Sequence, residues 1–400
     1  MIYLLVRNWL NWLEAQDLGY LRVFTYVTFR STVAVMLSFV ICVVLGPSVI
    51  RWLRQQKIGD TGGFDATGQP QLASVKKDTP TMGGLLIVGA IAATTLLLGD
   101  LSNFYVSMAL VCLLWLACVG AADDWLKLTV GRRAGSRQGL TTREKLIFQV
   151  GLGVVLSYFT FRYGRDVSET HTIYFPFLKN LQLDLTALDA WMPFGVPFQS
   201  VLISWGLIAF VLIGTVVLTG TSNAVNLTDG LDGLAAGCMA IVSFTFFVLA
   251  LIVGHRPLAG YLNLTHILAA GEMAVLAGAI AGACLGFLWF NCNPAKVFMG
   301  DTGSLALGGL IGYIAMVIRQ ELLLFIVGGI FVIEAISVML QVGYFKYTRR
   351  RYGEGRRIFL VAPLHHHFQK KGWTETQVVV RFWLIGAMLA AMALATVKLR

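Results

Sequence analysis

Long apolar runs separated by short polar segments dominate the chain. A membrane-spanning helix needs about 20 apolar residues to cross a hydrocarbon core of ~30 Å, and runs of roughly that length recur along almost the whole sequence. Lipid offers no hydrogen-bond partner to exposed backbone, so such runs are expected to be helices. The predicted spans are 23–50, 82–99, 104–122, 146–161, 200–220, 233–254, 270–290, 304–318, 321–345 and 379–397.

The pattern therefore predicts an all-α polytopic membrane protein with about ten transmembrane helices, built as one integral-membrane domain over residues 1–400. Two smaller elements are expected outside the spans. Trp9 and Trp12 favour an interfacial helix near the start of the chain. Side chains alternate through residues 172–175 and 181–185, which predicts a β-hairpin in the longest even-numbered loop.

Composition agrees with a membrane protein and argues against a nucleic-acid-binding one. Hydrophobic residues make up 57% of the chain and charged residues 13%, with a mean hydropathy of +0.73. The net charge of +10 comes from basic residues that border the spans, so anionic lipids or anionic substrates are the expected partners. The six cysteines lack the paired spacing of a metal site or a disulfide framework.

The distribution of Lys and Arg predicts the orientation in the membrane. The five odd-numbered loops hold 5, 6, 0, 1 and 8 of these residues, 20 in all, whereas the even-numbered loops hold 0, 3, 1 and 1, or 5. Basic residues concentrate in cytoplasmic loops, so the odd-numbered loops are expected in the cytoplasm and both termini outside. Arg30 and Glu272 lie near span ends and are expected to reach water.

Aspartates at the span ends are the first candidates for chemistry. Asp123 and Asp124 are adjacent at the end of the third span, where they either mark the water interface or form part of a site. In the fifth loop Asn226, Asp229 and Asp232 are three residues apart, so a helix would place them on one face, able to converge on one ligand. The alternative is an ordinary Asx-rich helix cap.

The seventh loop adds Asp301 between Gly300 and Gly303, with Ser304 as a candidate helix cap. Glycines beside a carboxylate permit close approach of a phosphate or a hydrated cation. The five aspartates of these loops share one membrane face. Oxygen ligands beside a phosphorylated substrate favour Mg²⁺, or Mn²⁺ as a substitute, over zinc.

Basic residues and histidines supply candidate phosphate contacts. His365, His366 and His367 follow a run of arginines in the ninth loop, and they are better suited to bind phosphate or sugar hydroxyls than to chelate one metal together. Lys76 precedes a glycine-opened span. Lys145 either contacts phosphate or snorkels to the interface. Glu334, inside the ninth span, indicates a polar groove or a buried pair.

These motifs, taken together, resemble the phospho-N-acetylmuramoyl-pentapeptide transferases of peptidoglycan synthesis. The resemblance covers essentially the whole chain, because each motif falls at its expected span boundary and in the family's order. The motifs that carry it are Thr79-Pro80-Thr81-Met82-Gly83-Gly84, Asp123-Asp124, Asn226 to Gly233, Asn291 to Ser304 and His365-His366-His367.

The resemblance implies a Mg²⁺-dependent enzyme of the bacterial inner membrane that transfers phospho-MurNAc-pentapeptide from UDP-MurNAc-pentapeptide to undecaprenyl phosphate, giving lipid I and UMP. It further implies a homodimer. Asp301 is then the metal ligand, with Asp123 and Asp124 as catalytic carboxylates, and Asp123 acts either as a base or as a covalent nucleophile. The implied substrate-binding residues are Lys76, Thr81, Lys127, Lys145, Asn226, Asp229, Asp232, Asn291, Phe298, Gly300, Ser304, Glu334, His365, His366 and His367.

Two other functions compete with this interpretation. A related transferase would move GlcNAc-1-phosphate or another hexosamine phosphate to the same lipid, although the histidine run argues against it. An ion-coupled transporter would also need membrane carboxylates, but transporters bind near the bilayer midplane and are commonly built from repeats. Here the acids lie at span ends, and the sequence has no visible repeat.

Overall fold

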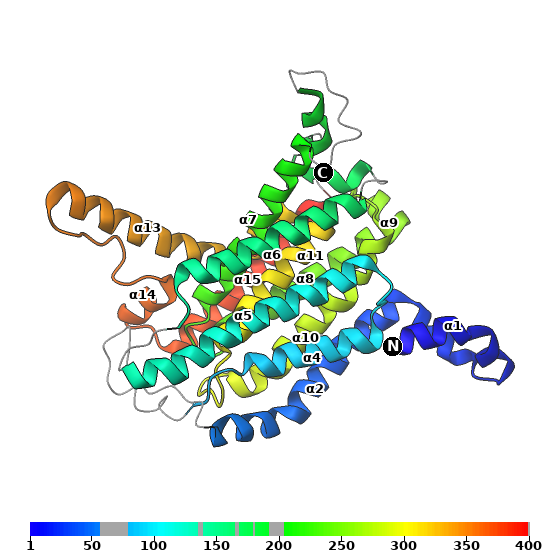
Figure 1. Ribbon diagram of the computed structural model, residues 1–400, viewed down its shortest axis with the longest axis horizontal. Helices are drawn as coiled ribbons and strands as arrows, with labels where there is room; N and C mark the ends of the chain where they lie inside the picture. Colours follow the sequence, from blue (N-terminus) through cyan, green and yellow to red (C-terminus); the bar gives the residue numbers. More distant parts are fainter. Residues whose placement is uncertain (57–78, 135–138, 165–167, 179–180, 192–203, 399–400) are drawn as a thin grey trace.

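The computed structural model describes the chain except for residues 57–78, 135–138, 165–167, 179–180, 192–203 and 399–400 (Figure 1). Among the described residues, nine helical segments are long and apolar enough to cross a membrane. The helices concerned are α2 (Val27–Gln55), α5 (Phe104–Ala134), α6 (Thr142–Tyr163), α7 (Trp205–Thr228), α8 (Leu234–Val253), α10 (Met273–Asn291), α11 (Gly300–Val317), α13 (Gly329–Tyr352) and α15 (Glu375–Val397).

A tenth apolar helix, α4 (Gly84–Leu98), is shorter. Each predicted span therefore overlaps a helix. One span, 321–345, is not continuous: the chain forms α12 (Glu321–Val327), turns at Gly328 and continues as α13 to Tyr352. The prediction of an all-α polytopic membrane protein is confirmed. The prediction of one continuous span over 321–345 is wrong, because the apolar pattern continues through the break at Gly328.

The smaller elements lie at the ends of the bundle. The predicted hairpin is present, with antiparallel strands that pair Thr172 with Asp184 and Tyr174 with Gln182. The helix that carries Trp9 and Trp12 is also present, and both rings are more than half exposed. These elements are α1 (Ile2–Ala15), η1 (Gly19–Thr25), η3 (Ser168–His171), β1 (Thr172–Tyr174), β2 (Gln182–Asp184), η4 (Leu185–Trp191), α9 (Arg256–Tyr261), η6 (Leu268–Glu272) and α14 (Leu364–Lys370).

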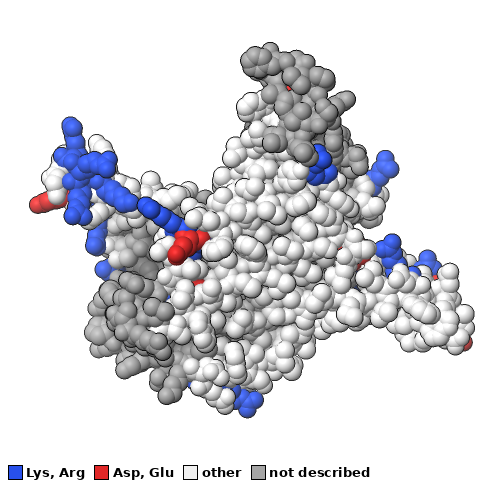
Figure 2. Space-filling view, in the orientation of Figure 1, with Lys and Arg blue, Asp and Glu red and all other residues white. Residues whose placement is uncertain are grey.

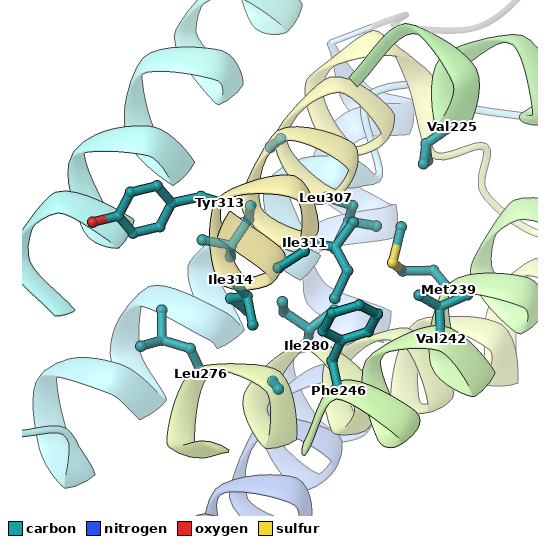
Figure 3. Close-up of a cluster of buried hydrophobic side chains, with 14 of the residues drawn as sticks. Val225, Met239, Val242, Phe246, Leu276, Ile280, Leu307, Ile311, Tyr313 and Ile314 are labelled. Carbon is teal, nitrogen blue, oxygen red and sulfur yellow. The ribbon is translucent and has the colours of Figure 1, made fainter. Parts of the chain in front are cut away.

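Helices α10 and α11 form the centre of the bundle. In the most apolar stretch of each, 83% and 89% of the residues are buried, against 28% in α2 and α13. Their apolar side chains meet those of α7 and α8 in the cluster of Figure 3, which includes Ile280, Ile311 and Phe246. The outer helices instead expose apolar side chains, among them Met36 and Val44 of α2 and Met339 of α13, and Figure 2 shows a broad face almost free of charged residues.

Small residues allow α10 to lie close to α2. Gly278, Gly282 and Gly286 recur every fourth residue, and a methyl group at any of them would overlap the α2 backbone. Apolar side chains gain little from leaving lipid for another helix, so close backbone approach is a main source of stability in membrane bundles. This spacing fixes α2 against the central helix.

A buried ion pair closes the end of the bundle where the two chain termini lie. The Arg30 guanidinium is 1% exposed, and it donates to both Glu272 oxygens at 2.5 and 2.7 Å and to the Leu98 carbonyl at 3.0 Å. The Tyr3 ring covers it, with 3.9 Å between the guanidinium carbon and the ring centroid. The expectation that Arg30 reaches water is therefore wrong, because its partner allows it to be buried.

The Arg30→Leu substitution is expected to lower the thermal unfolding temperature of the detergent-solubilised protein strongly, because removing one partner of a buried pair costs about 3–5 kcal/mol. Exposed Arg7, paired with Asp100 at 3.4 Å, provides the control, since Arg7→Leu should change that temperature little. Equal shifts for the two variants would show that the Arg30 pair does not carry this stability.

Candidate functional site

Three carboxylates meet at the end of the bundle opposite the Arg30 pair. Asp123 and Asp124 lie in α5, about three turns before its end, and Asp301 is the second residue of α11. One oxygen from each lies within 4.8 Å of the other two. Asp123 and Asp124, the adjacent acids singled out from the sequence, thus form one cluster with Asp301 of the seventh loop.

Asp124 binds the N-terminus of α11. Met299, the N-cap residue of this helix, donates or accepts no side-chain hydrogen bond that would cap it. Asp124 instead accepts the backbone N–H of Asp301 at 3.1 Å, that of Thr302 at 3.0 Å and the Thr302 hydroxyl at 2.7 Å. The first N–H groups of a helix have no partner within it and carry partial positive charge. Asp124 satisfies two of them from another helix.

Two lysines bridge the other two carboxylates. Lys145 Nζ lies 2.8 Å from Asp123 Oδ2 and 2.6 Å from Asp301 Oδ2. Lys127 Nζ lies 2.6 Å from Asp123 and 3.1 Å from Asp301. Three carboxylates and two ammonium groups leave one net negative charge. Because both lysines are held in place, their position is fixed before a ligand arrives.

Asp123 is fully buried, and both its oxygens face groups of the protein. Its Oδ1 accepts the backbone N–H of Leu140 at 2.7 Å, while its Oδ2 faces both lysines. The side chain of Asp301 is 12% exposed and that of Lys145 18%. Asp301 and the lysines therefore form the open side of the cluster.

Close backbone packing sets the position of Asp301. Gly300 has a φ of +73°, and a methyl group there would come within 2.7 Å of Asp124 Oδ2 and 3.1 Å of Thr81 Oγ1. Phe298 N–H donates to Pro80 O, and Gly83 N–H donates back to Phe298 O, both at 2.8 Å. Thr81 and Phe298 therefore lie on paired segments beside the cluster. Lys76 lies outside the described residues.

The Asn226 and Asp229 side chains adjoin the cluster. Asn226 donates to Ser304 Oγ at 2.9 Å, and Ser304 donates to Gly300 O at 2.9 Å. Asp229 accepts the Gly300 N–H, while burial and the nearby Asp301 and Asp124 carboxylates raise the pKa of Asp229 to about 8. Both residues thus contact the turn that precedes Asp301.

Asp232 and Asn291 join two loops instead of sharing a ligand face with Asn226. Helix α7 ends at Thr228, so the expected single helical face does not form. Asp232 accepts from Asn293 Nδ2 at 3.2 Å and from Ala295 N–H at 3.1 Å. Asn291 accepts the Gly233 N–H at 3.0 Å and donates to Val297 O at 2.9 Å. These contacts hold the 229–233 turn against the 291–297 loop.

The three histidines face different partners. His365 is fully buried, and its Nδ1 lies 3.3 Å from Glu334 Oε2. His366 Nδ1 lies 2.8 Å from Gln369 Oε1. His367 Nδ1 accepts the Leu360 N–H at 3.1 Å, and burial followed by the charge of Lys371 lowers the pKa of His367.

A buried polar network behind the lysines escaped the sequence analysis. Gln149 donates to Ser222 Oγ at 3.0 Å and accepts from Asn223 Nδ2 at 2.8 Å. Ser222 in turn donates to Leu305 O at 3.0 Å. These bonds tie α6, α7 and α11 together. Gln149 lies four residues after Lys145, so a polar residue on the lysine face of an apolar helix was the available signal.

The donor set of the cluster fits a divalent cation with hard oxygen ligands. Asp123, Asp124 and Asp301 offer carboxylate oxygens only, and the group contains no sulfur or imidazole ligand. Such a set suits Mg²⁺ or Mn²⁺. The net negative charge of the cluster favours the binding of a cation there.

Comparison with known families agrees with this arrangement. Residues 106–319, more than half of the chain, match the family described as glycosyl transferase family 4. Residues 76–88 match phospho-N-acetylmuramoyl-pentapeptide-transferase signature 1. The first match includes the three carboxylates and both bridging lysines, and the second includes Thr81. The chain therefore belongs to glycosyl transferase family 4 and, within it, to the phospho-N-acetylmuramoyl-pentapeptide transferases, which are membrane-embedded phosphosugar transferases.

Proposed function

We propose that the chain transfers phospho-MurNAc-pentapeptide from UDP-MurNAc-pentapeptide to undecaprenyl phosphate, giving lipid I and UMP. The observation that carries this proposal is the pair of lysines held between Asp123 and Asp301 at the end of a membrane bundle. Fixed cations beside acids suit a reaction between two phosphates, one on a water-soluble donor and one on a lipid. The family match supports the same reaction.

In the proposed step, an oxygen of the prenyl phosphate attacks the phosphorus that bears the sugar. A new P–O bond forms there, the bond to the bridging diphosphate oxygen breaks, and UMP leaves with that oxygen and the electron pair. Lys127 and Lys145 would stabilise the negative charge of the phosphates. Because both are already oriented by carboxylates, little reorganisation is needed during the reaction.

A bound Mg²⁺ or Mn²⁺ would withdraw charge from the phosphate oxygens. Asp301 is the proposed principal ligand, because its side chain is the most open of the three carboxylates. Asp124 would support it by holding the N-terminus of α11. Asp123 would orient the two lysines.

A single displacement is favoured over a covalent route through Asp123. A nucleophile must reach the phosphorus, whereas Asp123 is fully buried and engaged by Leu140 and two lysines. A prenyl phosphate with a second pKa near ~6 is already ionised at neutral pH, so it needs no base.

The donor would lie along the loops that surround Asp301. Asn226, Asp229 and Phe298 would border the nucleotide, with Phe298 stacking on uracil, while His366 and His367 would contact the sugar portion. Asp232 and Asn291 would act by holding the loops together. In addition to Lys127 and Lys145, the proposed phosphate contacts are Lys76, Thr81, Gly300 and Ser304.

The same proposal assigns the site to the cytoplasmic face of the bacterial inner membrane, with both termini outside. Its support is charge: Lys and Arg gather on the far end of α13 (Figure 2), at residues 346–357. By contrast, Met1 contacts Leu96 and Lys398 contacts Tyr261 at the opposite end. We further propose one transferase domain per chain and assembly as a homodimer.

The first test measures UMP release by the purified protein given undecaprenyl phosphate and UDP-MurNAc-pentapeptide. Activity is expected with Mg²⁺, to be abolished by EDTA and restored by Mg²⁺ or Mn²⁺. Asp301→Asn should lose about 10²-fold or more of kcat, because a fixed charge at the reacting phosphates is removed. Turnover with UDP-GlcNAc alone would instead identify a hexosamine-phosphate transferase.

Lys145→Met is expected to lower kcat by about 10²–10³-fold, since a preorganised charge is lost from the reacting centre. Lys398→Met, at the opposite end of the bundle, is the matched control and should retain wild-type kcat. A Lys145→Met variant with normal kcat and a raised donor KM would contradict a role in the chemical step and restrict the lysine to substrate binding.

The number of chemical steps is tested with a donor whose transferred phosphorus is made chiral by sulfur and oxygen isotopes. One in-line displacement inverts the configuration at that phosphorus, whereas two successive displacements retain it. Inversion is expected. Retention, or a phosphosugar trapped on Asp123, would overturn the single-step route.

A further inference from the structure

Glu334 is a fully buried carboxylate inside a membrane-spanning helix, and its carboxylate contacts His365. Its Oε1 accepts the His365 backbone N–H at 3.1 Å, and its Oε2 lies 3.3 Å from His365 Nδ1. A buried carboxylate in a membrane is costly unless it is paired. The backbone hydrogen bond to Glu334 holds the start of α14, and within the described part of the chain its second oxygen lies beside the His365 ring without a hydrogen bond.

The opposite edge of that ring packs against Gly230. A methyl group at position 230 would overlap His365 Nε2 and come within 3.0 Å of the neighbouring ring carbon. Among the described residues, neither ring nitrogen of His365 has a hydrogen-bond partner. The ring thus fills the space below the turn, and only a glycine at position 230 leaves room for it.

This turn leads directly to the carboxylate cluster. Gly230 follows Asp229, which accepts the Gly300 N–H, and Gly300 immediately precedes Asp301. A displacement of the His365 ring would therefore move the turn that contacts the base of α11. His366 and His367 are only half-buried and contact Gln369 and Leu360 instead.

We propose that Glu334 and His365 are positioning residues. Glu334 positions His365, and the His365 ring fixes the position of the Asp229–Gly230 turn relative to Asp301. In this assignment His365 does not contact the substrate, unlike the two histidines that follow it. The inference rests on the proposed function for its activity measurement, while its stability measurement is independent of the reaction.

The first experiment compares Glu334→Gln with Glu334→Leu. Glutamine can still accept the His365 N–H, whereas leucine cannot, so the glutamine variant should retain clearly more activity. Glu334→Leu is expected to lower kcat by about 10²-fold, the typical effect of misplacing reacting groups by about 1 Å. Ser337→Ala, at a buried position on the same helix whose hydroxyl donates to the Glu334 carbonyl, is the control and should keep wild-type kcat.

The second experiment tests the contact with Gly230. Gly230→Ala alone should lower both the unfolding temperature and kcat, because the new methyl group collides with the ring. In the double variant Gly230→Ala/His365→Ala the collision is absent, so the unfolding temperature should recover towards that of His365→Ala. The losses of kcat in the two single variants should not add, as expected of residues in contact.

The outcomes separate the two proposals. A wild-type protein that releases no UMP would overturn the proposed function, while recovery of the unfolding temperature in the double variant would still establish the His365–Gly230 contact. Wild-type kcat in His365→Ala together with a lowered unfolding temperature would reduce the pair to a structural role. Wild-type kcat in Glu334→Leu would overturn the positioning assignment outright.

Discussion

The contact between Asp124 and the first turn of α11 is the constraint on which the site depends. It joins one membrane helix to the beginning of another, and Asp301, whose backbone N–H it accepts, is itself a member of the cluster. A carboxylate near a helix N-terminus is favoured by the partial positive charge of the unpaired N–H groups. These hydrogen bonds offset part of the cost of burying Asp124 beside two other acids, and the charge of Lys127 adds to their effect.

The remaining charges follow from this geometry. Once Asp124 fixes α11, Asp301 faces Asp123, and two like charges at that distance need cations between them. Lys127 comes from the same helix as Asp123, one turn later, while Lys145 comes from α6. Gln149 then ties α6 to α7 one turn deeper. Polar groups in this half of the bundle are thus connected from helix to helix, which limits the number left unsatisfied.

The sequence predicted the helices and the places where polar residues cluster better than it predicted which residues bond to one another. The span ends identified Asp123, Asp124 and Asp301 because charged residues in a membrane protein collect at the water boundary. The cap made by Asp124 was not predictable, since it depends on how α5 packs against α11. The helical spacing of Asn226, Asp229 and Asp232 misled because α7 ends at Thr228, and nothing in the apolar pattern marks that end. Gly328 interrupts a predicted span for the same reason.

Helix length explains why the site suits one soluble and one lipid substrate. Helix α11 is 18 residues long, which corresponds to about 27 Å at 1.5 Å per residue. In α5, the 20 residues from Phe104 to Asp123 span about 30 Å. Both lengths are close to the ~30 Å hydrocarbon thickness. If Phe104 and Val317 lie near one boundary of the hydrocarbon layer, these lengths bring Asp123 and Asp301 near the other. A transporter would need such acids near the midplane, whereas a transferase needs them where a lipid phosphate and a nucleotide from water can meet.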